Sequence, residues 1–288
     1  MNIQIVHDYD DVICPDPGDR WFVAPGSLFA ALTDGCSEPH YAQDAPPFIY
    51  PGGLTGSQMV SKIVHDTFAL ALPTQSLENL VLSANEEIWQ TQKQNRGSAV
   101  SRDDAGTLAN ASFSCLKLEE RSNRAQVIWG ADVFTIWKTK SGKVQIAGGD
   151  NAQPDFERER IYRDLVEGAK DKNAARKEYF LKVFPGLKRK QDNVLYAVLN
   201  GQPSVSERWN VLFLPNDLEL IILLSDGAWI PIEKWGDNAQ MAEEFVRHFE
   251  KSGLNKALEW VRVLQKQGIA NARIARPEAT ALAIHFVN

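Results

Sequence analysis

The sequence predicts an α+β fold in which pairs of helices lie outside two β-sheets. Segments with helical periodicity come in pairs, and each pair separates blocks of strand-like sequence. Short charged turns join the strands within a block, which favours antiparallel hairpins over crossover helices. The chain of 288 residues contains no linker-like stretch and no repeat of fixed period, so we expect one layered domain over residues 1–288.

The first part of the chain predicts strands followed by two helices. Residues 1–34 alternate apolar runs with turn-forming Pro, Gly and Asp, which is typical of short strands. Residues 59–68 then place their apolar side chains on one helical face, and residues 77–88 do the same. Thr74 or Ser76 is the expected cap of the second helix, because either hydroxyl can accept a hydrogen bond from its first turn.

The middle of the chain predicts hairpins interrupted by a charged insert. Residues 111–148 hold alternating or continuous apolar runs separated by charged turns. Residues 150–192 are rich in Lys, Arg, Asp and Glu, and we expect surface helices there. Two apolar strands follow at 209–214 and 218–224, joined by a Pro-Asn-Asp turn.

The last part of the chain predicts a second helix pair and a closing strand. Residues 238–249 carry an apolar stripe that begins after a capping Asn238, and residues 254–264 carry another. Residues 280–286 form an apolar segment that we expect to be the last strand.

Composition excludes several classes of protein. The net charge of −6 argues against nucleic acid as a partner. The longest apolar run, residues 218–224, is far shorter than the roughly 20 residues that span a bilayer. Acidic residues stand where a secretory signal would carry Lys or Arg. The three cysteines have no metal-site spacing, which fits reduced thiols. We therefore expect a cytoplasmic protein without a membrane segment.

Two Asp-Gly pairs, Asp34-Gly35 and Asp226-Gly227, have the same sequence setting. In each, an apolar strand is followed by Thr or Ser and then by Asp-Gly. One interpretation is a pair of simple hairpin turns, because Asp-Gly is a common turn dipeptide. The other is a metal site, because carboxylates that converge from the strand ends of two sheets suit hard cations such as Mg²⁺ or Mn²⁺. The shared setting favours the metal site.

Six segments of the chain also resemble the metal-dependent Ser/Thr protein phosphatases of the PPM type, or type 2C. They follow the order of that family over nearly the whole chain, and the ordered set is more specific than any single segment. The segments are LFAALTDG (28–35), ASFSCLKL (111–118), VIWGADVFTIW (127–137), VLYAVLNGQ (194–202), LELIILLSDGAW (218–229) and PEATALAIHF (277–286).

The resemblance implies a four-layer α-β-β-α sandwich, in which helix pairs flank two antiparallel sheets, with two Mg²⁺ or Mn²⁺ ions between the sheets. By this analogy Asp34 bridges both ions, the Gly35 carbonyl binds one, and Asp226 binds the other. Asp34 and Asp226 are then the principal catalytic residues, and Asp19 matches a further family acid. Two such ions activate a shared water to attack phosphorus. The implied substrate is a phosphoserine or phosphothreonine protein in signalling, and a cognate Ser/Thr kinase is a second candidate partner.

The chain departs from the family pattern in ways that weaken the expected activity. Pro277 occupies the position of the closing metal-binding Asp, so the adjacent Glu278 must substitute for it or the ligand is lost. Gly18 stands where the family usually has an acid. Residues 1–18 contain no Arg or Lys to bind phosphate, so His7 is either a stand-in for that Arg or a plain structural residue.

The charged insert at about 150–192 occupies the place of the family's variable flap beside the active site. It is either a solvated helical face or a source of cations that reach a phosphate or an acidic partner surface. The candidate cations are Arg158, Arg160, Arg163 and Lys188–Lys190.

Three alternatives remain open. A haloacid-dehalogenase-type phosphatase would use Asp8 and Asp10, but it needs a parallel sheet that the hairpin-rich middle opposes. An N-terminal nucleophile hydrolase needs a Cys, Ser or Thr at its mature N-terminus, and Met1-Asn2 offers none. The third alternative keeps the phosphatase fold but makes the protein weakly active or inactive, with a role in binding phosphorylated or kinase partners.

Overall fold

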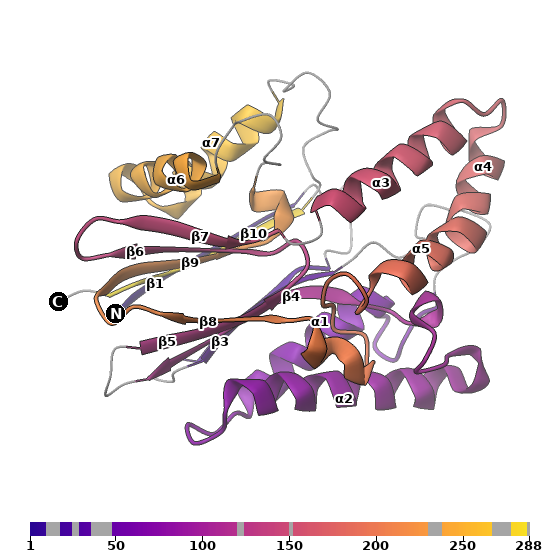
Figure 1. The fold of residues 1–288 in the computed structure, drawn as a ribbon, viewed down its shortest axis with the longest axis horizontal. Helices are drawn as coiled ribbons and strands as arrows, with labels where there is room; N and C mark the ends of the chain where they lie inside the picture. Colours follow the sequence, from indigo (N-terminus) through magenta and orange to yellow (C-terminus); the bar gives the residue numbers. More distant parts are fainter. Residues whose placement is uncertain are drawn as a thin grey trace.

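The computed structural model describes residues 1–9, 18–24, 29–35, 48–119, 124–149, 152–229, 238–266 and 278–286. These residues form two five-stranded sheets stacked face to face, with helices on both outer faces (Figure 1). All neighbouring strands pair antiparallel. The structure thus confirms the predicted α+β fold and its four α-β-β-α layers.

Each sheet mixes strands from distant parts of the sequence. The first sheet runs in the order β1 (Asn2–Tyr9), β10 (Glu278–His285), β9 (Leu218–Leu224), β6 (Phe134–Thr139) and β7 (Val144–Gly148). The second sheet runs in the order β2 (Arg20–Val23), β3 (Phe29–Gly35), β4 (Ala111–Glu119), β5 (Arg124–Gly130) and β8 (Asn210–Leu214). The β1–β10 pair joins the two ends of the chain and places His7 opposite Thr280. This antiparallel pairing of β1 excludes the haloacid-dehalogenase alternative; Asp10 lies outside the described residues.

The helix pairs cover the outer faces of the two sheets. On the second sheet lie α1 (Gly56–Ala69) and α2 (Leu77–Arg96), and on the first lie α6 (Asn238–Ser252) and α7 (Leu254–Lys266). A capping box starts α1, in which Thr55 and Gln58 bond each other's backbone N–H. Ser76, rather than Thr74, caps α2 by accepting from the Asn79 N–H.

Three apolar clusters hold the four layers together. Leu32, Leu116, Val127, Ile221 and Leu282 belong to the cluster between the sheets, because alternate strand residues face inward. The other two clusters fill the spaces between each sheet and its helices. Among the described residues, no helix has the length and apolarity needed to span a bilayer.

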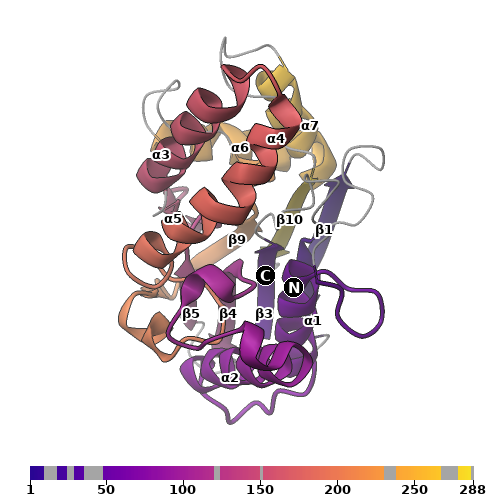
Figure 2. The same cartoon turned by 90° about the vertical axis from the view of Figure 1, so that its right-hand side faces the viewer.

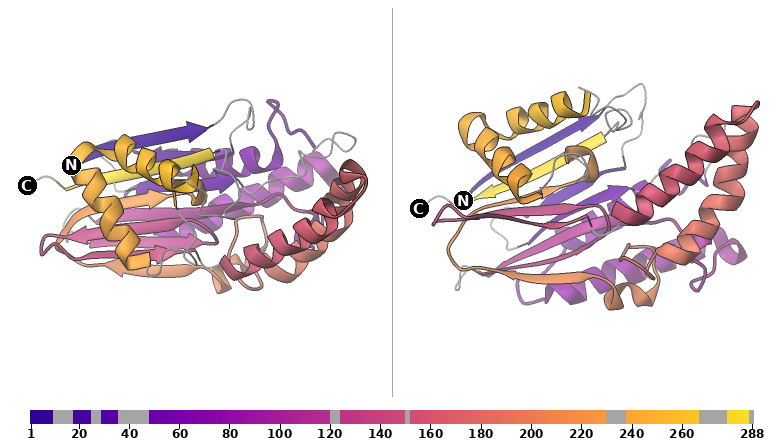
Figure 3. Two further views of the ribbon diagram at one scale, coloured as in Figure 1. Left: turned by 90° about the horizontal axis from the view of Figure 1, so that it is seen from above. Right: turned by 45° about the horizontal axis from the view of Figure 1, so that its top comes forward.

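The charged insert forms a helical arm at one end of the sandwich (Figures 1 and 3). It consists of α3 (Ala152–Tyr162), η3 (Arg163–Glu167), α4 (Lys172–Glu178), η4 (Tyr179–Val183) and α5 (Phe184–Gln191). Figure 2, in which this end faces the viewer, shows the arm in front of the strands. A small apolar cluster around Val166, Tyr179 and Leu187 packs the segment α3–η3 against the segment α4–η4–α5. The prediction of helices in this segment is therefore confirmed.

Short 3₁₀ turns complete the described structure. They are η1 (Gly97–Ala99), η2 (Ala105–Thr107), η5 (Pro203–Glu207) and η6 (Asp226–Ala228). The last of these begins with the second predicted aspartate, directly after β9 and Ser225.

Candidate metal centre

The two predicted Asp-Gly segments meet where their strands end. Asp34 is the penultimate residue of β3, and Gly35 ends that strand. Asp226 opens η6 at the end of β9 in the other sheet. The backbone N–H of Asp226 donates to Asp34 Oδ2 at 3.3 Å, although the two residues are 192 positions apart. The structure therefore brings the two segments together from different sheets, as a shared site requires.

Glycine is required beside both aspartates because backbones approach closely there. A Cβ on Gly35 would lie 2.8 Å from the Cα of Gly18, so the ends of β2 and β3 could not come together. A Cβ on Gly227 would lie 1.7 Å from the carbonyl oxygen of Glu278. A Cβ on Gly18 would in turn lie 3.1 Å from the Cα of Gly35, so a larger residue at position 18 would need a small shift of the Gly35 backbone.

Glu278 links the two sheets through its carboxylate. It is the first residue of β10, and its Oε1 accepts from the Asp19 N–H at 2.7 Å. Its Oε2 accepts from the Gly18 N–H at 2.9 Å. These bonds aim the Glu278 carboxylate at the start of β2, next to the buried side chain of Asp19. Pro277, the residue that replaces the family's closing Asp, lies outside the described residues.

Asp19 is an acid buried among other acids. The residue is only 5% exposed. Burial, followed by the charges of Asp34 and Glu278, holds the pKa of Asp19 well above its ordinary value, while hydrogen bonds with the Ser225 and Thr280 side chains oppose the shift. Within the described part of the chain, Asp19 Oδ2 has no hydrogen-bond partner. A buried carboxylate with an unused oxygen and acidic neighbours fits a cation, which would supply the missing positive charge.

His7 adds an imidazole to this group of acids. Its Nδ1 lies 2.8 Å from Thr280 Oγ1, and its Nε2 lies 3.8 Å from Glu278 Oε1. Burial is the main cause that lowers the pKa of His7, with the charge of Asp8 acting in the opposite direction. His7, Asp19 and Glu278 each offer one ligand atom, and these atoms lie within 4.8 Å of one another.

The pairing of β1 with β10 brings His7 to this place, and no sequence spacing shows it. Ser225 and Thr280, which orient Asp19, were likewise not identified from the sequence. The only sequence feature that could have indicated these two residues is a Thr or Ser close to an acidic residue at a strand end.

Two residues of α7 hold the loop that carries Asp226. Gln265 Nε2 donates to the Gly227 carbonyl at 2.9 Å and to the Trp229 carbonyl at 3.2 Å. Arg262 Nη1 donates to the same Gly227 carbonyl at 3.5 Å, and its Nε donates to Asp8 Oδ2 at 3.0 Å, which ties α7 to β1. Helix α7 thus fixes the Ser-Asp-Gly loop against the strand that carries His7.

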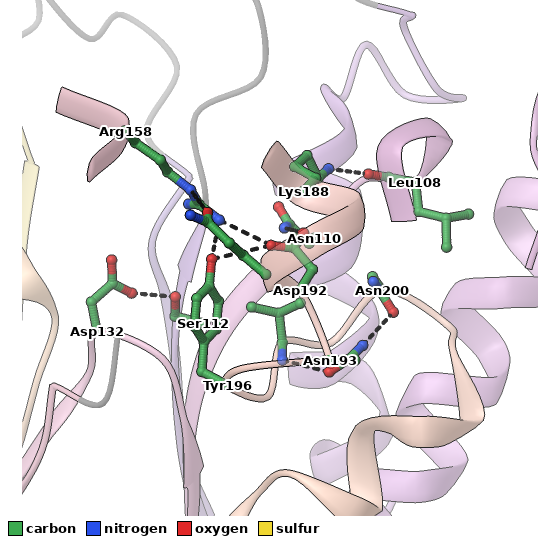
Figure 4. A network of polar contacts seen from close by, with 12 residues as sticks. Leu108, Asn110, Ser112, Asp132, Arg158, Lys188, Asp192, Asn193, Tyr196 and Asn200 are labelled. Carbon is green, nitrogen blue, oxygen red and sulfur yellow. Dashed lines mark hydrogen bonds and ion pairs between the residues drawn. The ribbon is translucent and has the colours of Figure 1, made fainter. Parts of the chain in front are cut away.

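The helical arm is anchored close to the start of β4 (Figure 4). Arg158 of α3 donates to Asp192 Oδ1 at 3.0 Å and to the Tyr196 hydroxyl. The Tyr196 side chain packs against Ala131, the neighbour of Asp132. Asp132 accepts from the Ser112 hydroxyl, and Ser112 lies opposite Asp34 in the β3–β4 pair. A chain of contacts therefore runs from the arm to the strand that carries Asp34.

Three of the six cations named as candidates to reach a phosphate or an acidic partner make ion pairs or hydrogen bonds within this chain. Arg158 pairs with Asp192, Lys188 Nζ donates to the Leu108 carbonyl, and Arg189 pairs with Asp104. Arg160, Arg163 and Lys190 are exposed.

Comparison with known proteins gives matches at the level of structure. No protein-family model and no curated protein sequence matches this chain. The catalytic domain of the Ser/Thr protein phosphatase PstP in complex with two manganese ions is 11% identical, with a TM-score of 0.55 and 99% of both chains covered. The Ser/Thr phosphatase Stp1 from Staphylococcus aureus is 14% identical, with a TM-score of 0.55 over 99% of this chain and 95% of that one. RsbX in complex with magnesium is 10% identical, with a TM-score of 0.54 over 98% of this chain and 92% of that one.

These matches agree with the resemblance of the sequence segments. The RsbX structure holds magnesium and the PstP structure holds manganese, and both ions suit the carboxylates of the candidate centre. At identities of 10–14% the likeness establishes architecture. This chain therefore has the fold of the PPM-type, metal-dependent Ser/Thr phosphatases.

Proposed function

We propose that this protein is a metal-dependent phosphatase that hydrolyses phosphoserine and phosphothreonine in proteins. The observation that carries the proposal is the contact between the Asp34 and Asp226 segments, with Asp19 and Glu278 beside them. The fold shared with PstP and Stp1, both Ser/Thr phosphatases, supports the reaction and the substrate class. A cytoplasmic location and a cognate kinase partner are part of the same proposal.

In this proposal Asp34, the Gly35 carbonyl and Asp226 are the principal ligands of two Mg²⁺ or Mn²⁺ ions, and Asp19 and Glu278 complete the centre. When bound, two such ions supply an activated water and stabilise charge on the phosphoryl oxygens. The protein's own groups hold the ligands in place. The Asp226 N–H orients Asp34, and the N–H groups of Gly18 and Asp19 orient Glu278.

We also propose that residues 1–288 form one phosphatase domain and that residues 150–192 are its flap. The position of the arm at one end of the sandwich supports this role (Figure 2). So do the contacts that connect Arg158, through Tyr196, to the turn at Asp132.

The test is hydrolysis of p-nitrophenyl phosphate and of a phosphothreonine peptide, in EDTA, in Mg²⁺ and in Mn²⁺. We expect turnover only with metal, and a loss of at least about 100-fold in Asp34→Asn and in Asp226→Asn, because each replaces a charged carboxylate ligand by a neutral amide. Asp217→Asn, in the exposed β8–β9 turn, is the matched control and should keep full activity. Turnover in EDTA, or full activity in both site variants, would overturn the proposal.

A second candidate function is a phosphatase fold that binds phosphorylated or kinase partners without hydrolysing them. Two observations favour it. Residues 1–18 provide no Lys or Arg for a phosphate, and both oxygens of Glu278 already accept backbone hydrogen bonds. Absence of turnover with every metal, together with binding of the phosphothreonine peptide by fluorescence anisotropy, would establish this function instead.

A further inference from the structure

We propose that His7 is a nitrogen ligand of the cation held by Asp19 and Glu278, so that this part of the centre prefers a first-row transition cation to Mg²⁺. The inference deepens the proposed function by naming the class of ion that the same site takes. It concerns binding, and its test needs no catalytic activity.

The positions of the three side chains suit one cation. Two ligands that each lie about 2.1 Å from an ion are between about 3 and 4.2 Å apart, depending on the angle between them. His7 Nε2 and Glu278 Oε1 are separated by 3.8 Å, which falls inside this range. The ligand atoms of His7, Asp19 and Glu278 all lie within 4.8 Å of one another, so small side-chain adjustments complete the set.

The hydrogen bond between His7 Nδ1 and Thr280 orients the imidazole so that its Nε2 atom faces Glu278. With a cation bound, Asp19 is ionised and its carboxylate only accepts hydrogen bonds, so the Thr280 hydroxyl that interacts with it donates its single proton there. The same Thr280 oxygen then accepts from His7 Nδ1–H at 2.8 Å. This tautomer leaves the Nε2 lone pair on the side of Glu278. Metal-binding histidines are held in the same way, with the other ring nitrogen donating to an oxygen.

Asp19 gives an independent indication of a bound cation. Asp19 is buried, with 5% of the residue exposed. Its Oδ2 atom lacks a hydrogen-bond partner in the described structure. Buried polar atoms without partners are rare in folded proteins and point to a missing ion or water. Asp19 is also one of the three residues whose ligand atoms lie within 4.8 Å of one another, together with His7 and Glu278.

The imidazole determines which ion the site prefers. Mg²⁺ takes oxygen ligands and keeps several waters, whereas imidazole nitrogen favours transition cations. Affinities for a mixed nitrogen and oxygen site rise from Mn²⁺ to Co²⁺ and beyond. A centre built from His7, Asp19 and Glu278 should therefore bind Co²⁺ more tightly than Mn²⁺, and both more tightly than Mg²⁺.

The experiment measures binding of Co²⁺, Mn²⁺ and Mg²⁺ to the metal-free protein by calorimetry, in wild type and in His7→Gln. We expect His7→Gln to lose about 10- to 100-fold in affinity for Co²⁺ and Mn²⁺, with a much smaller change for Mg²⁺. His65→Gln is the matched control, because His65 is half-buried on α1 outside the cluster. Unchanged Co²⁺ and Mn²⁺ affinity in a folded His7→Gln protein would overturn the inference.

Pulsed EPR of the Mn²⁺-loaded wild type gives a second measurement that needs no variant. A coordinated imidazole should produce nitrogen modulation that changes when histidine is supplied as the ¹⁵N form. Absence of nitrogen coupling would overturn the inference even if His7→Gln does not fold. Nitrogen coupling in a protein that hydrolyses nothing would support the inference and contradict the proposed function, so the two failures are distinguishable.

Discussion

At the scale of single residues, Asp19 shows what the candidate centre requires. The fold buries this carboxylate beside Asp34 and Glu278, and burial together with those charges raises its pKa. Hydrogen bonds from the Ser225 and Thr280 hydroxyls offset only part of this increase in the pKa of Asp19. Asp19 therefore keeps its proton to a higher pH in the metal-free protein than in the unfolded chain, and a cation would oppose this effect because it binds the ionised form.

This arrangement predicts a pH dependence for the metal-free protein. In the unfolded chain the pKa of Asp19 is about 3.9, and in the folded state it is higher. Between these two values the folded protein binds a proton that the unfolded chain does not, so the free energy of unfolding falls as pH rises. Urea unfolding in EDTA should show this fall in wild type, and Asp19→Asn should remove it. If Asp19→Asn unfolds with the wild-type pH profile, the electrostatic account of Asp19 is wrong.

At the scale of elements, the loop between β9 and η6 depends on close backbone contact. A methyl group on Gly227 would overlap the carbonyl oxygen of Glu278. We expect Gly227→Ala to lower the free energy of unfolding by about 3 kcal/mol, and to weaken metal binding because it moves Asp226. Gly186 in α5 is the control, because a Cβ there meets no atom within 4 Å.

Gly186→Ala should change stability by less than about 1 kcal/mol, in the stabilising direction, since alanine restricts the unfolded chain. Chemical denaturation measures both variants. Equal stability of Gly227→Ala and Gly186→Ala would contradict the proposed contact between η6 and β10.

The anchor of the helical arm gives a second prediction at this scale. The Asp192 side chain is fully buried, and Arg158 is its charged partner at 3.0 Å. Arg158→Leu leaves that carboxylate to two neutral donors, the Asn110 amide at 2.6 Å and the Tyr196 hydroxyl at 3.2 Å. Removing one partner of a buried ion pair costs about 3 kcal/mol or more, so the urea midpoint should fall clearly.

Arg163→Leu tests whether the loss of stability is specific to the Arg158–Asp192 pair. Arg163 lies in the same arm but is exposed, and its replacement should change the free energy of unfolding by less than about 0.5 kcal/mol. A similar small change in Arg158→Leu would show that the Arg158–Asp192 pair does not hold the arm.

At the scale of the whole molecule, the candidate centre joins the two sheets. His7, Asp226 and Glu278 belong to the first sheet and its loops, whereas Asp19 and Asp34 belong to the second. A cation bound by side chains from both sheets would link the two sheets. We expect Mn²⁺ at about 100 times its dissociation constant to raise the free energy of unfolding by about 2.7 kcal/mol.

Hydrogen exchange measures which strands bound Mn²⁺ stabilises. Mn²⁺ should slow exchange at the start of β10 and at the end of β3, which lie in different sheets. The double variant Asp34→Asn/Asp226→Asn should lose the slower exchange at the end of β3 and most of the gain in stability. An equal gain in that variant would place the ion elsewhere.

Much of the architecture followed from local patterns in the sequence. The stripes at 59–68 and 238–249 predicted helices that the structure contains, because a period of 3.6 residues requires only neighbouring positions. The apolar runs at 111–119 and 218–224 predicted strands with the observed bounds. The two Asp-Gly pairs were recognisable because each repeats the same short context of strand, hydroxyl and acid. Local periodicity and composition therefore determined the elements, their order and the principal acids of the candidate centre.

The family resemblance named Asp19 and Glu278, but only the tertiary structure decided which atoms contact one another and that His7 lies beside these acids. Glu278 meets the N–H of Gly18 across 260 positions of sequence, and His7 meets Thr280 across 273. Such contacts depend on the order and register of strands, which in turn depend on how the two sheets pack. The role of Gly18 has the same origin, because its neighbour Gly35 approaches only when β2 and β3 pair. A sequence shows which side chains exist, but the packing of distant strands determines which of them come within reach of one ion.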